Sequence, residues 1–285
     1  MMSDPRERFA ELTKVTACYR DEGNENGEPL LLVMGLSSQL IHWPQEIVDA
    51  LGERGYRVIR FDNRDSGLTR WKVTPAQYFL QAMADDAVEL LDHLGIEQAH
   101  VVGASMGGMI SQLIAIGRPE RVRTLCSIMS TTGDPSVGQP ADGVIGELLR
   151  PLPEDPREAI IQIAHVYDVI GSRTHAASER PGRLELAGEA YRRAVHPDGG
   201  ARQIAAILMA LDRTRSLQAL RVPALVIHGG EDPLIDISGG EATHAAVAGS
   251  TYLPLPDMGH DLPRPLHHRI VNSIVENAQQ RVAVA

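Results

Sequence analysis

Residues 100 to 110 read HVVGASMGGMI, an apolar run that ends at Gly103 and continues, after one serine, into a helical pattern. The stretch matches the pattern G-x-S-x-G, in which Gly103 and Gly107 flank Ser105. In this pattern the chain turns sharply from a buried strand into a helix, and side chains two residues either side of the serine would collide with the turn. The simpler alternative is a glycine-rich turn in which Ser105 only caps a helix. The rest of the sequence has to decide between them.

The composition limits the classes of protein that this chain can represent. It has 285 residues, of which 43% are hydrophobic, and a formal net charge of −10. The length fits one α/β domain with an insertion. The negative charge disfavours binding to phosphate backbones, so we expect no nucleic-acid partner. Two cysteines, Cys18 and Cys126, lie in apolar stretches and are expected to be buried thiols rather than a disulfide.

The first residues of the sequence do not resemble a secretory signal. These residues, MMSDPRERFAELTK, lack the apolar segment of a secretory signal, and no run of about 18 apolar residues follows. We therefore expect a soluble, cytoplasmic protein without a membrane span. Nothing in the sequence indicates an oligomeric state.

Apolar runs of strand length alternate with stretches of helical periodicity. Predicted strands cover residues 29–34, 56–61, 99–102, 123–129, 222–228 and 251–255, and predicted helices cover 43–54, 84–94, 109–116 and 265–280. This alternation indicates right-handed βαβ units and a mostly parallel central sheet flanked by helices.

The pattern changes between residues 132 and 220. Prolines cluster near the start of this segment, and helical stretches at 159–170 and 204–211 follow without strands. We interpret the segment as a helical cap inserted into the core. The predicted division is core over residues 1–132, cap over 133–220 and core again over 221–285.

A serine is a poor nucleophile unless a base lies within hydrogen-bonding reach, and that base needs an acid to fix its tautomer. Asp232 follows the predicted strand that ends at His228, and His260 follows the last predicted strand on a glycine-containing loop. Active sites of open α/β sheets lie at these carboxyl ends. The chain order therefore predicts Ser105 as nucleophile, His260 as base and Asp232 as its orienting acid.

Other residues compete for these roles. Glu231 beside Asp232 could be the acid instead, as could Asp134 after the strand that contains Cys126, and His260 could be a surface histidine. A metal site at His267 and His268 is disfavoured because adjacent histidines point in different directions on a helix. We therefore predict no metal and no cofactor.

Two backbone amides could stabilise a developing oxyanion. The Met106 N–H would lie at the N-terminus of the helix that follows Ser105. The second predicted donor is the N–H of Leu36, in the loop after the first buried strand, where Gly35 lets the backbone approach. The alternative for this loop is a plain turn.

With these residues in hand, the chain resembles the α/β-hydrolase superfamily, and within it the aclacinomycin methylesterase group and the related actinobacterial lipase and carboxylesterase group. The similar stretches are LLVMGLSSQLIHWP (31–44), RVIRFDNRDSG (57–67), HVVGASMGG (100–108) and PDMGH (256–260). The resemblance implies the α/β-hydrolase fold and the same five residues: Ser105, Asp232, His260, Leu36 and Met106. One departure is Met34-Gly35, where many members have His-Gly.

These features predict a serine carboxylesterase that hydrolyses short to medium esters, methyl esters among them, through an acyl-enzyme. The expected partner is a small-molecule ester. Two alternatives stay open: a cofactor-free haloperoxidase or perhydrolase with the same triad, and a receptor that binds a small ligand without turnover. Apolar cap residues could line a pocket over Ser105 or simply pack on the core: Tyr167, Val169, Ile207, Leu208, Met209 and Leu211.

Overall fold

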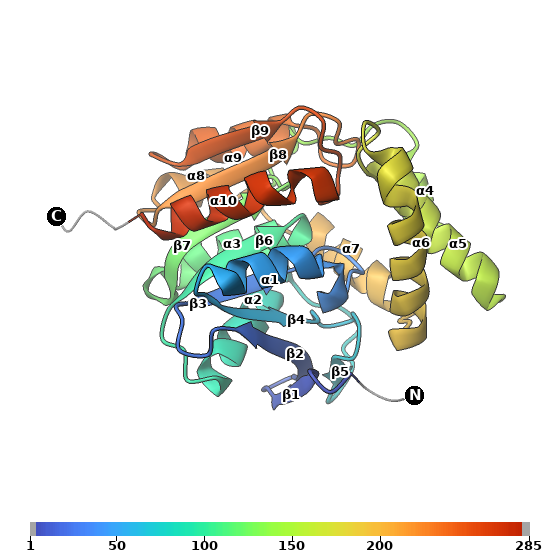
Figure 1. Ribbon diagram of the computed structural model, residues 1–285, viewed down its shortest axis with the longest axis horizontal. Coiled ribbons are helices and arrows are strands. Elements are labelled where there is room, and N and C mark those ends of the chain that lie inside the picture. The colour runs from blue at the N-terminus through green and yellow to red at the C-terminus, as the bar shows by residue number, and fades with distance from the viewer. Residues whose placement is uncertain (1–3, 281–285) are drawn as a thin grey trace.

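The computed structural model describes residues 4–280, and a nine-stranded sheet forms the centre of this part (Figure 1). The strands are β1 (Arg8–Glu11), β2 (Val15–Gly23), β3 (Pro29–Val33), β4 (Arg57–Phe61), β5 (Arg70–Trp71), β6 (Ala99–Ala104), β7 (Val122–Ile128), β8 (Ala224–Gly229) and β9 (Thr251–Leu255). Their order in the sheet is β1-β2-β4-β3-β6-β7-β8-β9, and β5 pairs with β2.

Six neighbouring strands of this sheet, from β4 to β9 in the sheet order, are all parallel. The strands β1, β2 and β5 at one end pair antiparallel. The prediction of a mostly parallel sheet flanked by helices is therefore confirmed. Each of the six predicted strands corresponds to one of the six parallel strands.

The helices are α1 (Gln45–Glu53), α2 (Leu80–His93), α3 (Met106–Gly117), α4 (Val144–Leu148), α5 (Pro156–Ile170), α6 (Ala176–Arg193), α7 (Gly199–Leu208), α8 (Thr214–Gln218), α9 (Ser238–Ala246) and α10 (His267–Ala278). The predicted helix at 204–211 corresponds to α7, which begins at Gly199 and ends at Leu208. The helix begins earlier than predicted because Gly199 and Gly200 form its first turn, whereas glycines in a sequence usually indicate a loop. Among residues 4–280, none of the helices has both the length and the apolar composition to cross a membrane.

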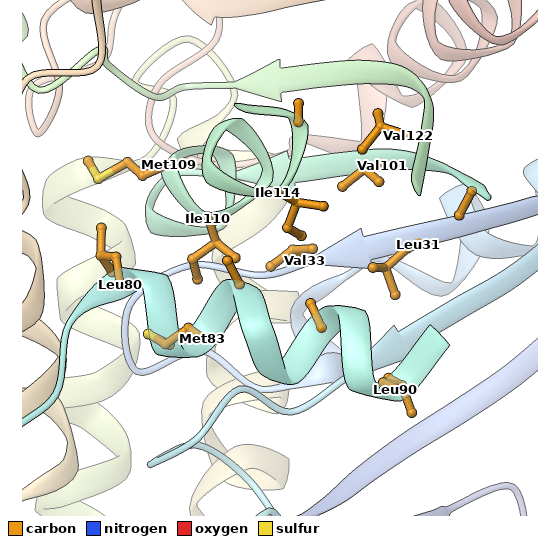
Figure 2. Close-up of a cluster of buried hydrophobic side chains, with 14 of the residues drawn as sticks. Leu31, Val33, Leu80, Met83, Leu90, Val101, Met109, Ile110, Ile114 and Val122 are labelled. Carbon is orange, nitrogen blue, oxygen red and sulfur yellow. The ribbon is translucent and has the colours of Figure 1, made fainter. Parts of the chain in front are cut away.

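Alternate residues of each central strand face opposite helical layers. In β3, Leu31 and Val33 belong to the apolar cluster under α2 and α3 (Figure 2), whereas Leu30 and Leu32 belong to the cluster under α1 and α10. All four side chains are fully buried. Because side chains alternate across a strand, a continuous apolar run is required when both faces are covered.

Five helices, α4 to α8, lie between β7 and β8 in the chain. Figure 1 shows α4, α5 and α6 grouped at one side of the sheet. In contrast, α7 and α8 contribute Ala206 and Leu217 to the apolar cluster under α2 and α3, which is the main apolar cluster. The inserted helices thus belong in part to the core, and the cap of residues 133–220 as a separate unit stays a prediction.

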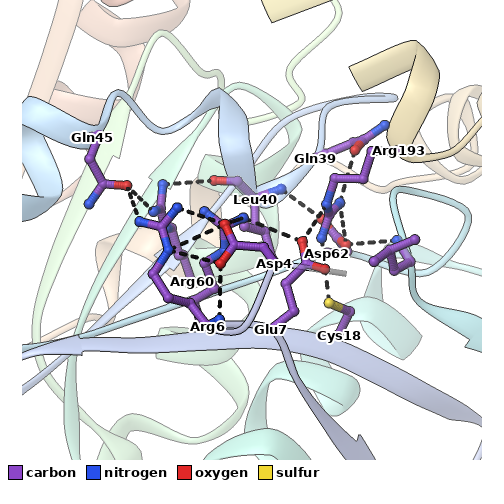
Figure 3. Close-up of polar contacts among 12 residues, drawn as sticks. Asp4, Arg6, Glu7, Cys18, Gln39, Leu40, Gln45, Arg60, Asp62 and Arg193 are labelled. Atoms are coloured by element: carbon purple, nitrogen blue, oxygen red, sulfur yellow. Dashed lines mark hydrogen bonds and ion pairs between the residues drawn. The ribbon is translucent and has the colours of Figure 1, made fainter. Parts of the chain in front are cut away.

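A buried ionic network fastens the C-terminal end of α6 to the core (Figure 3). Arg193 contacts Asp62, in the loop after β4, at 2.7 Å and Glu7 at 2.7 Å. It also donates a hydrogen bond to the side chain of Gln39. The carboxylate of Asp62 is fully buried, and it accepts two further hydrogen bonds from backbone amides.

Candidate active site

The turn between β6 and α3 places Ser105 at the end of the strand with φ 57° and ψ −124°. A Cβ on Gly103 would overlap the carbonyl of Gly107, and a Cβ on Gly107 would overlap the carbonyl of Val33. Only glycine fits at these two positions, for the steric reason that the G-x-S-x-G pattern suggested. The Ser105 backbone is fixed further by its N–H, which donates to Ile128 at 2.9 Å.

Because of this contact, Gly107→Ala is expected to destabilise the fold by about 1 to 3 kcal/mol, since the backbone of β3 would have to move. The matched control is Gly117→Ala at the exposed end of the same helix, where an added Cβ meets nothing within 4 Å. That variant should be neutral or slightly stabilising, because alanine favours the helix. Urea unfolding of both proteins checks this, and equal stabilities would contradict it.

Three side chains from separate loops meet at the carboxyl end of the sheet. The Oγ of Ser105 lies 2.8 Å from Nε2 of His260, and Nδ1 of the same ring lies 2.7 Å from Oδ2 of Asp232. Asp232 and His260 are both buried, whereas Ser105 is partly exposed. This arrangement allows a proton to pass from the serine hydroxyl to the ring while the carboxylate stabilises the resulting imidazolium.

Two amides lie next to this serine. Met106 is the first residue of α3, so its N–H has no acceptor within the helix and lies at the positive end of the helix dipole. The loop after β3 passes close by, because a Cβ added at Gly35 would lie 3.1 Å from the Cβ of Ser105. Leu36 follows directly in this loop. Both predicted oxyanion donors are thus carried by segments adjacent to the serine.

The architecture has clear relatives. A model of the alpha/beta hydrolase fold matches residues 28–263. The chain belongs to the α/β-hydrolase family. It is a hydrolase of that family.

Two curated proteins and one solved structure illustrate what this α/β-hydrolase is similar to. Rhodomycin D methylesterase DauP of Streptomyces sp. is 26% identical over 92% of this chain and 94% of its own length. The 3-oxoadipate enol-lactonase 2 of Acinetobacter baylyi is 28% identical over 88% of this chain and 90% of its own. The enol-lactonase structure from Burkholderia xenovorans has a TM-score of 0.79 at 23% identity, covering 96% of this chain and 100% of that one.

The carboxylate of Asp232 in this α/β-hydrolase is held from several sides. Its Oδ1 accepts hydrogen bonds from the backbone amides of Leu234 and Ile235, both at 2.9 Å. Its Oδ2 faces His260, and Nε2 of the fully buried His228 lies 3.5 Å away. Burial acts to raise the pKa of Asp232, but the two histidines outweigh it and hold this pKa well below its usual range. The carboxyl group of Asp232 is therefore ionised at neutral pH.

This lowered pKa predicts a pH-dependent stability difference between the wild type and Asp232→Asn. The charged carboxylate stabilises the folded state fully above its ordinary pKa of 3.8, and this contribution declines as the pH falls further. The variant should therefore be less stable at pH 7, with a deficit that shrinks below about pH 4. Asp142→Asn at an exposed position is the control. A deficit that is independent of pH, measured by urea unfolding, would contradict the expectation.

The competing acids of this α/β-hydrolase have other partners. Glu231 accepts hydrogen bonds from the amides of Arg173 and Thr174, and Asp134 accepts them from Ser136. At the two histidines where a metal site was disfavoured, Nε2 of His267 lies 2.9 Å from the carbonyl oxygen of Leu262. Within the described part of the chain, no group of three or more His, Cys, Asp or Glu side chains is placed to hold a metal ion.

The apolar residues of the inserted segment differ in their surroundings. Leu208 and Leu211 are 80% and 84% exposed, and Ile207 packs against the main apolar cluster. Tyr167 lies near the loop after β3, where its hydroxyl is 3.2 Å from the Oγ of Ser38. The exposure of Leu208 and Leu211 and the packing of Ile207 do not support a common pocket lining. The sequence could not reveal this, because helical spacing alone does not tell which face of a helix is covered.

One residue at the site was missed by sequence reasoning. The side chain of Gln203 in α7 is fully buried, and its Oε1 accepts the N–H of Ser37 at 2.7 Å. Its Nε2 donates to the carbonyl of Arg64 at 2.7 Å. Gln203 thus fixes the loop that carries Leu36. A single glutamine in an amphipathic helix has no pattern that would reveal this contact.

Proposed function

We propose that the protein is a serine carboxylesterase that hydrolyses short to medium carboxylic esters through an acyl-enzyme. The observation that carries this proposal is the chain of two short hydrogen bonds from Ser105 Oγ through His260 to Asp232, at 2.8 and 2.7 Å. Such a chain supplies a nucleophile, a base and an orienting acid in one unit.

The mechanism uses these groups in two half-reactions. Ser105 Oγ attacks the ester carbonyl carbon while its proton passes to Nε2 of His260. The amides of Leu36 and Met106 donate hydrogen bonds to the oxyanion, and each such donor is worth about 3 to 4 kcal/mol in the transition state. His260 then gives its proton to the leaving alcohol, which departs and leaves the acyl group on Ser105. Water repeats the sequence, and the carboxylic acid is released.

The names of the relatives support an ester as the substrate class. One is a methylesterase and another an enol-lactonase, and both names describe cleavage of a bond between an acyl carbon and an alkoxy or enol oxygen. A serine nucleophile suits this bond, because the acyl-enzyme that it forms is itself an ester and is open to attack by water. Methyl esters are therefore included in the proposal.

The test is a panel of p-nitrophenyl esters from acetate through butyrate and octanoate to palmitate, with a set of methyl esters followed by acid release. We expect the highest kcat/KM among the short and medium acyl chains and a fall at palmitate. Faster acyl transfer to hydrogen peroxide than to water would favour a perhydrolase instead. Tight ester binding without turnover would favour a receptor, and either result would contradict the proposal.

A further inference from the structure

The turn between α5 and α6, residues 170–175, contacts the loop that carries His260. The carbonyl of Ile170 accepts the backbone N–H of His260 at 2.7 Å. The Oγ of Ser172 accepts the N–H of Gly259 at 2.8 Å. Two consecutive backbone amides, one of them that of the candidate base, are therefore fixed by the cap rather than by the sheet.

The residue after His260 is held by the same turn. Oδ1 of Asp261 accepts hydrogen bonds from both the N–H and the Oγ of Ser172, at 3.0 and 2.6 Å. Its Oδ2 pairs with Arg183 of α6 at 2.7 Å. Ser172 is fully buried and Arg183 is 7% exposed, so water competes little for these contacts. The hydroxyl of Ser172 thus accepts from one neighbour of His260 and donates to the other.

The turn also reaches the loop of the candidate acid. Glu231, directly before Asp232, accepts hydrogen bonds from the amides of Arg173 and Thr174 at 2.7 and 2.9 Å. Asp257 at the start of the His260 loop lies 2.8 Å from Nε2 of His175. One turn of the cap therefore bridges the two loops that carry the base and the acid.

The turn at residues 170–175 packs tightly against the loop that carries His260. A Cβ on Gly259 would overlap the backbone of Gly171 and of Ser172. Glycine is required at position 259 because the backbone of the cap lies directly against it. A small displacement of the turn would therefore be transmitted to the His260 loop, as packed interiors do not deform freely.

We propose that Ser172, together with Asp261, is a positioning residue that holds the His260 ring in line between Ser105 and Asp232. The inference rests on the proposed function and concerns how the base is aligned. Without the Ser172 hydroxyl, Gly259 loses a hydrogen-bond acceptor and Asp261 loses one of its donors. The loop would then shift by a fraction of an ångström, which lowers the rate of proton transfer but leaves substrate contacts intact.

The experiment compares Ser172→Ala with Ser216→Ala, the same substitution at an exposed position of α8. We expect kcat for p-nitrophenyl butyrate to fall about tenfold or more in Ser172→Ala, while KM changes less than about twofold. The far-downfield proton resonance of the bond between His260 and Asp232, assigned by its absence in His260→Ala, should broaden or disappear. Ser216→Ala should match the wild type in all three measurements.

A purely structural role would lower the thermal transition but leave kcat and the proton resonance unchanged below it. That result, or an unchanged Ser172→Ala, would overturn the proposal. If Ser172→Ala does not fold, Asp261→Asn decides by the same readouts, because it keeps an acceptor for Ser172 and removes the pairing with Arg183. Failure of the proposed function would differ, because the wild type would then not hydrolyse p-nitrophenyl butyrate, or Ser105→Ala would hydrolyse it as fast as the wild type.

Discussion

Replacement of Ser105 by alanine is expected to reduce ester hydrolysis by roughly 100,000-fold or more, because it removes the hydroxyl that forms the acyl-enzyme in the proposed mechanism. The residual rate would come from the two amides and from substrate binding, which still act on an attacking water. The measurement is kcat for p-nitrophenyl acetate, with a fluorophosphonate titration that counts any remaining active serine.

The fold should survive this substitution, since the Ser105 backbone is fixed by the hydrogen bond that its N–H donates to the carbonyl of Ile128 and by the two flanking glycines. The control is Ser216→Ala at an exposed position of α8, which should keep wild-type activity. If Ser105→Ala is folded and retains most of the activity, another nucleophile does the chemistry and the proposed mechanism is wrong.

The largest effect on stability is expected from Arg193→Met, which should cost about 3 to 5 kcal/mol of unfolding free energy. The substitution keeps the apolar length of the side chain but leaves the fully buried carboxylate of Asp62 without its cation. Burial already raises the pKa of Asp62 while Arg193 opposes the rise. The deficit should therefore shrink as the pH falls, because a protonated carboxyl needs no cation.

Urea unfolding measures this deficit, and two further variants interpret it. Arg264→Met breaks an exposed ion pair, in which the side chains of Arg264 and Glu46 are 75% and 53% exposed, and should cost less than about 1 kcal/mol. The double variant Arg193→Met with Asp62→Asn should regain part of the loss, since the buried charge is gone. Equal losses in Arg193→Met and Arg264→Met would contradict the importance of burial.

The parallel part of the sheet could be predicted because it is covered on both faces, which forces uninterrupted apolar runs such as Leu30 to Val33. Elements without such cover left weaker signals. The two-residue strand β5 is too short for any periodicity, and α6 contains Pro181 within a mainly exposed and polar sequence. These segments form through contacts made elsewhere in the chain.

The candidate site shows the same division. Ser105, Asp232 and His260 could be named because each follows a recognisable strand, and the structure brings them within hydrogen-bonding distance. Gln203 and Ser172 could not, because their partners lie more than eighty residues away, and these contacts form only when the inserted helices pack against the loops at the sheet edge. Chain order reveals which loops share a sheet edge, but it does not reveal which residues of other elements pack against these loops.

Ser105 has a positive φ of 57°, which residues other than glycine rarely adopt. A residue other than glycine in such a sparsely populated conformation costs about 1 to 3 kcal/mol, and glycine at this position would remove the cost. Heat resistance and activity therefore oppose each other at this position. A library of variants selected for survival at high temperature alone would favour glycine there, and each gain would discard the hydroxyl on which the proposed mechanism depends.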